Sequence, residues 1–348
     1  MITAIRWILL PFSFIYQFVV WIRNLCYDKG IFKSTSFDIP TIVIGNLAIG
    51  GTGKSPLTEY LIKLLSPDYK VATLSRGYGR TTKGFRYVHT DSLASEVGDE
   101  PLQFKHKFPH ITVAVSEDRC MGIRQIKDKH DLILLDDAYQ HRKLKPGFSI
   151  LLLEYHSLFK PILMLPTGDF RDSFSAMRRV DLIMVTKCPK HITAESKISI
   201  EQKIRKYSNA PLFYTHIAYD NALDKNGQSI QTELENKDIL LFCGIAKPQP
   251  LITYLENKGN RVQAILFPDH HNFTEKDYRQ IKRAYSSIAA SDKIILTTEK
   301  DFQRLNIADF VGFPLAYIPI KVEFSDQERK TFDQAIQNYL KTPSVNKR

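Results

Sequence analysis

The chain has 348 residues, 43% of them hydrophobic, which predicts two domains with sizeable cores and excludes a disordered chain. Its formal net charge of +11 favours an anionic partner, which could be a nucleic acid, a membrane surface or a phosphorylated substrate. Its cysteines, Cys26, Cys120, Cys188 and Cys243, have no metal-ligand spacing, which argues against structural zinc or a disulfide framework and favours a reducing cytosol.

The first thirty residues contain an apolar segment, WILLPFSFIYQFVVWI, between Arg6 and Arg23. A helix of about 16 residues is about 24 Å long, shorter than the ~30 Å hydrocarbon core of a bilayer. A signal peptide is disfavoured because no cleavage site with small residues follows. We expect residues 1–30 to form a membrane-associated helix in the interface, with Trp7 and Trp21 at headgroup level. The alternative is an amphipathic helix packed on the protein's own core.

From residue 41 onward, apolar strand-like runs alternate with helical patterns, which is typical of an α/β fold with a mostly parallel sheet. A second, smaller α/β unit is expected after about residue 236, and the polar stretch 220–237, with Asn-Gly at 226–227, is expected to be a connection or hairpin turn. The expected strands are 41–46, 70–75, 111–116, 131–137, 149–154 and 181–187 in the first unit, and 238–244, 261–267 and 293–301 in the second.

The strongest local pattern is TIVIGNLAIGGTGKSP, a strand followed by a glycine-rich loop and the start of a helix. Backbone N–H groups of such a loop bind phosphate oxygens, the lysine reaches the β- and γ-phosphates, and the serine hydroxyl joins the Mg²⁺ shell. Ala48 replaces the first glycine of the usual pattern, and a glycine-rich turn without a ligand is the alternative. The predicted nucleotide-binding residues are Gly50, Gly51, Thr52, Gly53, Lys54 and Ser55.

Acidic residues follow the strand at 131–137, where Asp136 and Asp137 are placed as the Mg²⁺-binding carboxylates of a P-loop protein. A helix cap is the simpler interpretation of that pair. The segments GDEP and FPDHH contain candidates for a general base, namely Asp99 and His270. An Asp–His pair can accept and pass on the proton of an attacking hydroxyl, although spacing alone does not bring the two together.

Arginines and one tyrosine recur in the segments SRGYGR, EDR and LPTGDFRD. Arginine forks suit phosphate oxygens of a nucleotide or an acceptor, whereas solvated surface charge is the simpler interpretation of any single one. The segment VTKCPK lacks the aspartate of the guanine-reading pattern N-K-x-D, which favours ATP over GTP. The predicted substrate-binding residues are Arg76, Tyr78, Arg80, Arg119 and Arg171.

Taken in order, VIGNLAIGGTGKSP, LSRGYGR, VGDEP, EDR, LLDDAYQHR, LPTGDFRD, VTKCP, FCGIAKP, FPDHHNFT and TTEKD resemble the tetraacyldisaccharide 4'-kinases. The resemblance covers the chain to about residue 324. It implies transfer of the γ-phosphate of ATP, with Mg²⁺, to the 4'-hydroxyl of the lipid A disaccharide 1-phosphate. It also implies a peripheral location at the cytoplasmic face of the inner membrane.

The resemblance further assigns Asp99 as the catalytic base, His270 as its partner and Lys54 as a catalytic residue. Asp172 replaces the glutamate that this family usually has as a Mg²⁺-associated residue, so a bridging water is expected there. Segments 211–219 and 314–324 are expected to form a two-stranded hinge. The predicted divisions are 1–30 for the membrane helix, 31–210 for the nucleotide-binding domain, 211–237 for the hinge, 238–324 for the lid and 325–348 for a C-terminal helix and tail.

Two other functions fit parts of the pattern. A membrane-associated P-loop ATPase or GTPase switch would need no lipid acceptor and would leave FPDHH without a chemical role. A nucleic-acid-binding ATPase is suggested only by charge, and no aromatic–basic pattern supports it. We therefore expect a lipid-linked disaccharide and a membrane surface as partners, no nucleic acid, and a monomer.

Overall fold

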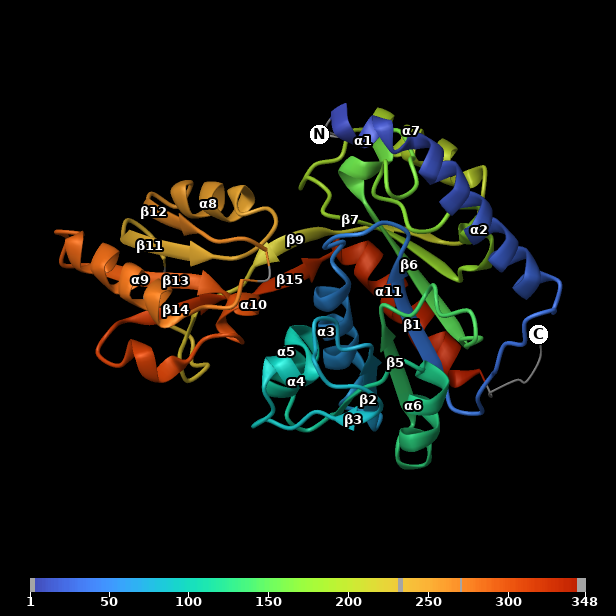
Figure 1. Ribbon diagram of the computed structural model, residues 1–348, viewed down its shortest axis with the longest axis horizontal. Coiled ribbons are helices and arrows are strands. Elements are labelled where there is room, and N and C mark those ends of the chain that lie inside the picture. The colour runs from blue at the N-terminus through green and yellow to red at the C-terminus, as the bar shows by residue number, and fades with distance from the viewer. Residues whose placement is uncertain (1–3, 231–233, 270, 343–348) are drawn as a thin grey trace.

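The computed structural model describes residues 4–230, 234–269 and 271–342. Two α/β units lie side by side and are joined by a ribbon of two antiparallel strands, β9 (His216–Tyr219) and β15 (Ile320–Glu323) (Figure 1). The chain therefore crosses from the larger unit to the smaller one and back through one narrow connection. The α/β fold expected from the sequence is confirmed.

The larger unit contains a sheet that, within the described residues, has eight strands in the order β3-β4-β2-β5-β1-β6-β7-β8. All neighbours are parallel except the edge pair β3–β4. The strands are β1 (Thr41–Asn46), β2 (Val71–Ser75), β3 (Arg86–Tyr87), β4 (Thr112–Val115), β5 (Leu132–Asp136), β6 (Phe148–Glu154), β7 (Leu182–Thr186) and β8 (Leu212–Tyr214). The central strand β1 is buried along its whole length, as continuous apolar runs predict for parallel strands.

Helices cover both faces of this sheet, because alternate side chains of β1 enter opposite cores. Val43 packs in one core with residues of α6 and α7, while Ile42 and Ile44 pack in the other with residues of α3 and α11. The helices of this unit are α3 (Lys54–Leu65), α4 (Ala94–Val97), α5 (Asp99–Lys107), α6 (Arg119–Ile126), α7 (Ala194–Arg205), α11 (Asp326–Lys341) and the 3₁₀ turns η1 (Lys127–Lys129), η2 (Tyr155–Phe159) and η3 (Phe174–Arg179).

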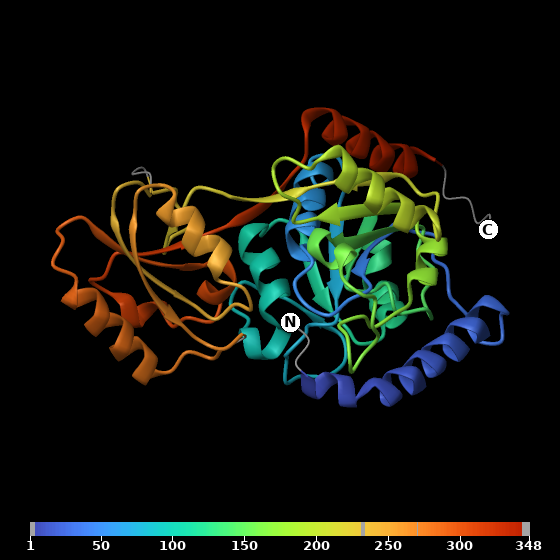
Figure 2. The ribbon, with the colours of Figure 1, turned by 90° about the horizontal axis from the view of Figure 1, so that it is seen from above.

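The N-terminal segment forms α1 (Ala4–Ile8) and α2 (Leu10–Asp28), and Figure 2 shows α2 along the outside of the larger unit. Pro11 lies in the first turn of α2, where a missing N–H costs no hydrogen bond, so it starts this helix rather than breaking it. Among the described residues of α2, only Ser13 and Val20 are buried. The large side chains that stay exposed are Trp7, Ile8, Phe12, Phe14, Ile15, Phe18, Val19, Trp21, Ile22 and Leu25.

No helix in the described ranges combines the length and the apolar character needed to cross a bilayer. The interfacial position expected for α2 is not tested by this finding. It stays a prediction, and the exposed apolar side chains of α2 are the ones that a membrane interface would cover.

The smaller unit contains a sheet with, in the part of the chain that the structure describes, five strands in the order β10-β14-β13-β11-β12. The strands are β10 (Leu223–Asp224), β11 (Asp238–Cys243), β12 (Arg261–Leu266), β13 (Lys293–Thr298) and β14 (Leu315–Ile318). The helices are α8 (Gln249–Glu256), α9 (Glu275–Ser287), α10 (Glu299–Phe302) and the 3₁₀ turn η4 (Ile307–Phe310).

Two sequence predictions need correction. The strand expected over 293–301 ends at Thr298, because the Thr298 hydroxyl accepts a hydrogen bond from the N–H of Asp301 and caps α10. The two predicted hinge segments each supply one strand to the ribbon and another to a large sheet, so only β9 and β15 form the hinge ribbon. The division of the chain at 210, 237 and 324 stays a prediction.

Candidate active site

The glycine-rich loop lies between the carboxyl end of β1 and the first turn of α3. Gly50 and Gly53 have φ angles of 102° and 89°, which a residue with a side chain rarely adopts. The Thr52 hydroxyl accepts a hydrogen bond from Asn46 Nδ2 at 2.8 Å, and the Thr52 carbonyl accepts one from the Thr186 hydroxyl at 2.7 Å. The loop is thereby fixed to the ends of β1 and β7, with the N-terminus of α3 beside it.

The carboxyl end of β5 places Asp136 and Asp137 next to this loop. Lys54 Nζ is 3.9 Å from Asp137 Oδ1. Arg171 donates to both carboxylate oxygens of Asp137 and also to Asn46 Oδ1. Burial would raise the pKa of Asp137, but the hydrogen bonds from Arg171 and the charge of Lys54 hold it below its usual value. Asp137 is therefore an anion held by two cations.

Asp136 has a different environment, because its side chain is fully buried and its Oδ1 atom has no hydrogen-bond partner among the described residues. Burial, reinforced by the charges of Glu100 and Asp137, raises the pKa of Asp136 to about 8. Glu100 Oε1 accepts a hydrogen bond from the Ser55 hydroxyl at 2.8 Å. The unpartnered oxygen of Asp136, the neighbouring carboxylate of Glu100 and the Ser55 hydroxyl bound to Glu100 are oxygen donors of the kind that Mg²⁺ prefers.

Glu100 was missed by the analysis of the sequence, although it stands in the quoted segment GDEP. Its neighbour Asp99 was predicted as a general base from the same segment, whereas nothing in the spacing shows that residue 100 meets Ser55. Asn46 was also missed, and the signal for it was its place at the end of a buried strand before the glycine-rich loop.

The predicted arginines do not share one environment. Arg119 is 4% exposed, and its Nη2 donates to the Asp137 carbonyl at 3.1 Å. Burial lowers the pKa of Arg119 to about 10. The Arg80 guanidinium donates to the carbonyl of Gly84 and to Glu117, so part of it is engaged in holding its own loop.

A cavity of about 530 Å³ is lined by the loop that contains Arg80. Arg76 and Tyr78 line it, and Tyr78 is 76% exposed. Buried nitrogens of Arg80, Arg119 and Arg171 have no hydrogen-bond partner among the described residues. Of these three arginines, Arg80 lines the cavity, and a cationic donor without an acceptor there is a group that a polyanionic ligand would satisfy.

Asp99 is the first residue of α5 and follows Gly98, which has a φ of 93°. Its Oδ1 accepts a hydrogen bond from Arg304 Nε at 2.9 Å, and its Oδ2 accepts one from Arg304 Nη2. Arg304 comes from the smaller unit, and the sequence analysis did not single it out. His270, the predicted partner of Asp99, lies outside the described residues.

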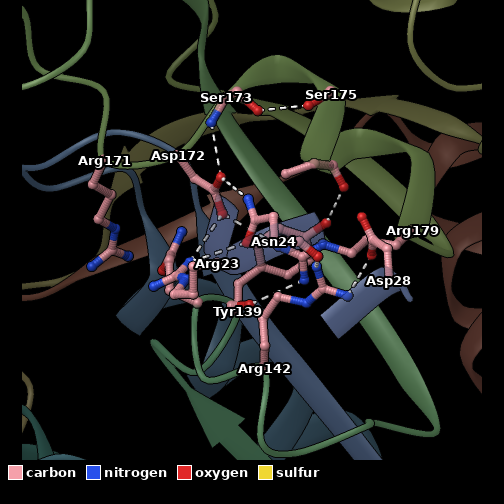
Figure 3. Close-up of polar contacts among 12 residues, drawn as sticks. Arg23, Asn24, Asp28, Tyr139, Arg142, Arg171, Asp172, Ser173, Ser175 and Arg179 are labelled. Carbon is pink, nitrogen blue, oxygen red and sulfur yellow. Dashed lines mark hydrogen bonds and ion pairs between the residues drawn. The ribbon is translucent and has the colours of Figure 1, made fainter. Parts of the chain in front are cut away.

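Asp172 lies in a separate polar cluster beneath α2 (Figure 3). Its oxygens accept hydrogen bonds from Asn24 Nδ2 at 3.0 Å, from the Ser173 N–H at 2.9 Å and from Arg179 Nη2 at 3.3 Å. Figure 3 shows Arg171, the preceding residue, extending away from this cluster. In this structure Asp172 anchors the C-terminal half of α2, and its predicted metal role stays a prediction.

Comparisons with known proteins agree with this geometry. The sequence matches the family described as tetraacyldisaccharide-1-P 4'-kinase over residues 5–341. The tetraacyldisaccharide 4'-kinase of Flavobacterium johnsoniae is 44% identical over 341 residues, which cover 97% of this chain and 98% of that protein. The tetraacyldisaccharide 4'-kinase of Phocaeicola vulgatus is 41% identical over 354 residues, with 98% and 96% coverage.

A solved structure is also similar over nearly the whole chain. It is the complex of LpxK from Aquifex aeolicus with ATP, which matches with a TM-score of 0.77 and 28% identity. The match covers 97% of this chain and 100% of that one. The similarity therefore includes both α/β units.

Proposed function

Because the chain belongs to the tetraacyldisaccharide-1-P 4'-kinase family, we propose that its described site transfers the γ-phosphate of ATP to the 4'-hydroxyl of tetraacyldisaccharide 1-phosphate. The enzyme is thus a phosphotransferase of lipid A biosynthesis with an alcohol group as acceptor. Family membership along nearly the whole chain favours this reaction over a nucleotide-driven switch acting on a protein partner.

The observation that carries the residue assignments is the meeting of three elements at one edge of the larger sheet. The phosphate loop brings Lys54 and Ser55, the end of β5 brings Asp136 and Asp137, and the start of α5 brings Glu100 into contact with Ser55. Phosphoryl transfer needs mainly positioning and electrostatic stabilisation, which a cation-rich loop facing carboxylates supplies. When bound, Mg²⁺ would be held by oxygens of Ser55, Asp136, Asp137 and Glu100 and would neutralise charge on the phosphates.

The residues of the chain then have distinct tasks. Lys54 stabilises negative charge on the transferred phosphate, and Arg171 keeps Asp137 ionised and oriented. Asp99 receives the proton of the attacking 4'-hydroxyl, with His270 as its partner. Arg76, Tyr78 and Arg80 line the cavity in which the acceptor lies, while Arg119 holds the Asp137 carbonyl.

We assign α2 to the membrane surface at the cytoplasmic face of the inner membrane, with the enzyme acting as a peripheral monomer. The apolar side chains exposed along α2 support this location, because a helix of this kind is stable in the headgroup region. The positive net charge acts in the same direction, since each Lys or Arg near an anionic leaflet contributes about 1 kcal/mol. The enzyme would then reach its lipid acceptor at the membrane surface, where the acceptor resides.

The test is transfer of ³²P from γ-labelled ATP to tetraacyldisaccharide 1-phosphate in detergent with Mg²⁺. Wild type should label the lipid, and Asp99→Ala should lose about 10²-fold or more in kcat, the usual contribution of a general base. His270→Ala should lower kcat in the same direction. Asp91→Ala, which changes an exposed aspartate in the preceding loop, is the matched control and should retain activity. A folded, ATP-binding wild type that labels no lipid would refute the assignment.

A further inference from the structure

One face of α5 lies against the smaller unit. Asp99, Gln103 and Lys107 are four residues apart along this helix, so their side chains lie on the same side of it. Asp99 contacts Arg304, while Gln103 and Lys107 both contact Glu299. The helix that begins with the proposed base therefore meets residues of α10 and the turn after it along its whole length.

Arg304 is a well-fixed partner for the base. Its side chain is 4% exposed, and it donates through Nε and Nη2 to the two oxygens of Asp99. Its Nη1 atom is 3.5 Å from Asp301, which is fully buried. Asp301 in turn accepts hydrogen bonds from the Gly244 N–H at 3.0 Å and from the Thr298 hydroxyl at 2.7 Å. The guanidinium is thus attached to the ends of β11 and β13.

Behind this pair, two carboxylates share one lysine. Lys107 Nζ is 2.6 Å from Glu59 Oε2 and 2.9 Å from Glu299 Oε1. Gln103 Nε2 donates to the same two carboxylates, at 2.7 Å and 3.1 Å. Glu59 lies on α3, the helix that follows the phosphate loop. Glu299 therefore attaches α10 to α5, and the same Gln103 and Lys107 connect α5 to Glu59 on α3.

We propose that Arg304 is a positioning residue for the base, so that the smaller unit orients the Asp99 carboxylate when it docks on α5. This inference rests on the proposed role of Asp99. A planar guanidinium that binds both oxygens fixes the plane of the carboxylate, which a lysine cannot do. Glu299 adds a second contact of the smaller unit on the same helix, through Gln103 and Lys107.

The alternative is that Arg304 only holds the two units together. The two roles predict different effects on kcat when substitutions of Arg304 and Asp99 are combined. A positioning residue acts through the base and has nothing to orient once the base carboxylate is removed, whereas a purely structural residue lowers activity by the same factor in either background.

The test uses the full chain, with Arg304→Gln and Arg304→Lys in the wild-type and Asp99→Ala backgrounds. The readouts are kcat and KM for lipid phosphorylation and the Kd for ATP. Arg304→Gln should lower kcat by about 10-fold to 100-fold, the effect expected of a misaligned reacting group, with the Kd for ATP changed less than about 2-fold. Arg304→Lys should recover part of the loss. Arg279→Gln, at an arginine that is 61% exposed on α9, is the matched control.

In the Asp99→Ala background, Arg304→Gln should change the residual kcat by less than about 2-fold. An equal loss in both backgrounds, or wild-type kcat in Arg304→Gln, would overturn the inference. If Arg304→Gln unfolds, as judged by circular dichroism, the same comparison is made with Arg304→Lys, which keeps the charge. Failure of the proposed function appears separately, as a wild type that labels no lipid or an Asp99→Ala variant that is as active as wild type.

Discussion

Replacing Glu299 by glutamine should stabilise the protein at pH 8 and have a much smaller effect at pH 5. Glu299 is 6% exposed and faces Glu59 and Lys63 on α3, Lys107 on α5 and Tyr317 on β14. Burial and the charge of Glu59 raise the pKa of Glu299 to about 7, although Lys107 acts in the opposite direction. At pH 5 the folded protein therefore holds Glu299 in its protonated form. The amide of glutamine has the same shape and the same zero charge as that form.

The sign follows from proton binding. A carboxyl group with a higher pKa in the folded state binds its proton more tightly there, so its contribution to stability is complete below about pH 4.5 and is lost as the pH rises through about 7. Glutamine has no such loss. The difference between a pKa of 4.5 and about 7 corresponds to about 3 kcal/mol. Because Glu59 shares Lys107 and can take up part of the proton, we expect a gain of about 1–3 kcal/mol at pH 8.

The assay is urea unfolding followed by far-UV circular dichroism at pH 5, 6, 7 and 8. Lys107 keeps Glu59 as a partner at 2.6 Å, so the substitution leaves the lysine paired. Glu275→Gln, at an acidic side chain that is 83% exposed, is the control and should show no pH-dependent difference from wild type. A difference between Glu299→Gln and wild type that is the same at pH 5 and pH 8 would refute the reasoning.

Three further outcomes are expected. Phe332→Ala should lower the free energy of unfolding by about 3–5 kcal/mol in urea titrations, because Phe332 is fully buried in the core that attaches α11 to the larger sheet. Arg171→Ala should lower kcat for lipid phosphorylation by about 10-fold or more, since Asp137 loses its bidentate partner. The double substitution Phe14→Ser and Phe18→Ser should weaken sedimentation with anionic lipid vesicles by about 10-fold or more, because both rings are exposed on α2, while activity on detergent-dispersed lipid persists.

Much of the fold followed from local patterns. Strands β1, β2 and β4 to β7 lie within a residue or so of the expected ranges, because buried parallel strands are short, continuous apolar runs with polar ends. The glycine-rich loop could be predicted equally well, because the glycines that adopt positive φ angles, the lysine and the serine are adjacent in the sequence. The order of the motifs also sufficed to indicate the family.

Contacts between distant residues could not be predicted in this way. Arg304 lies 205 positions from Asp99, and nothing in either local sequence marks the pair. Glu100 meets Ser55 only because α5 packs beside the phosphate loop. Asp172 stands next to Arg171 in the sequence, yet its contacts are with α2 and Arg179 rather than with Asp137.

The sequence by itself therefore determined most of the elements and the glycine-rich loop, since these depend on the conformational preferences and hydrophobic pattern of neighbouring residues. Only the tertiary structure decided which carboxylates face the glycine-rich loop, which one anchors α2, and which arginine pairs with Asp99. Those choices depend on how the sheets and helices pack, and packing is set by side chains that the chain brings together from both of its units.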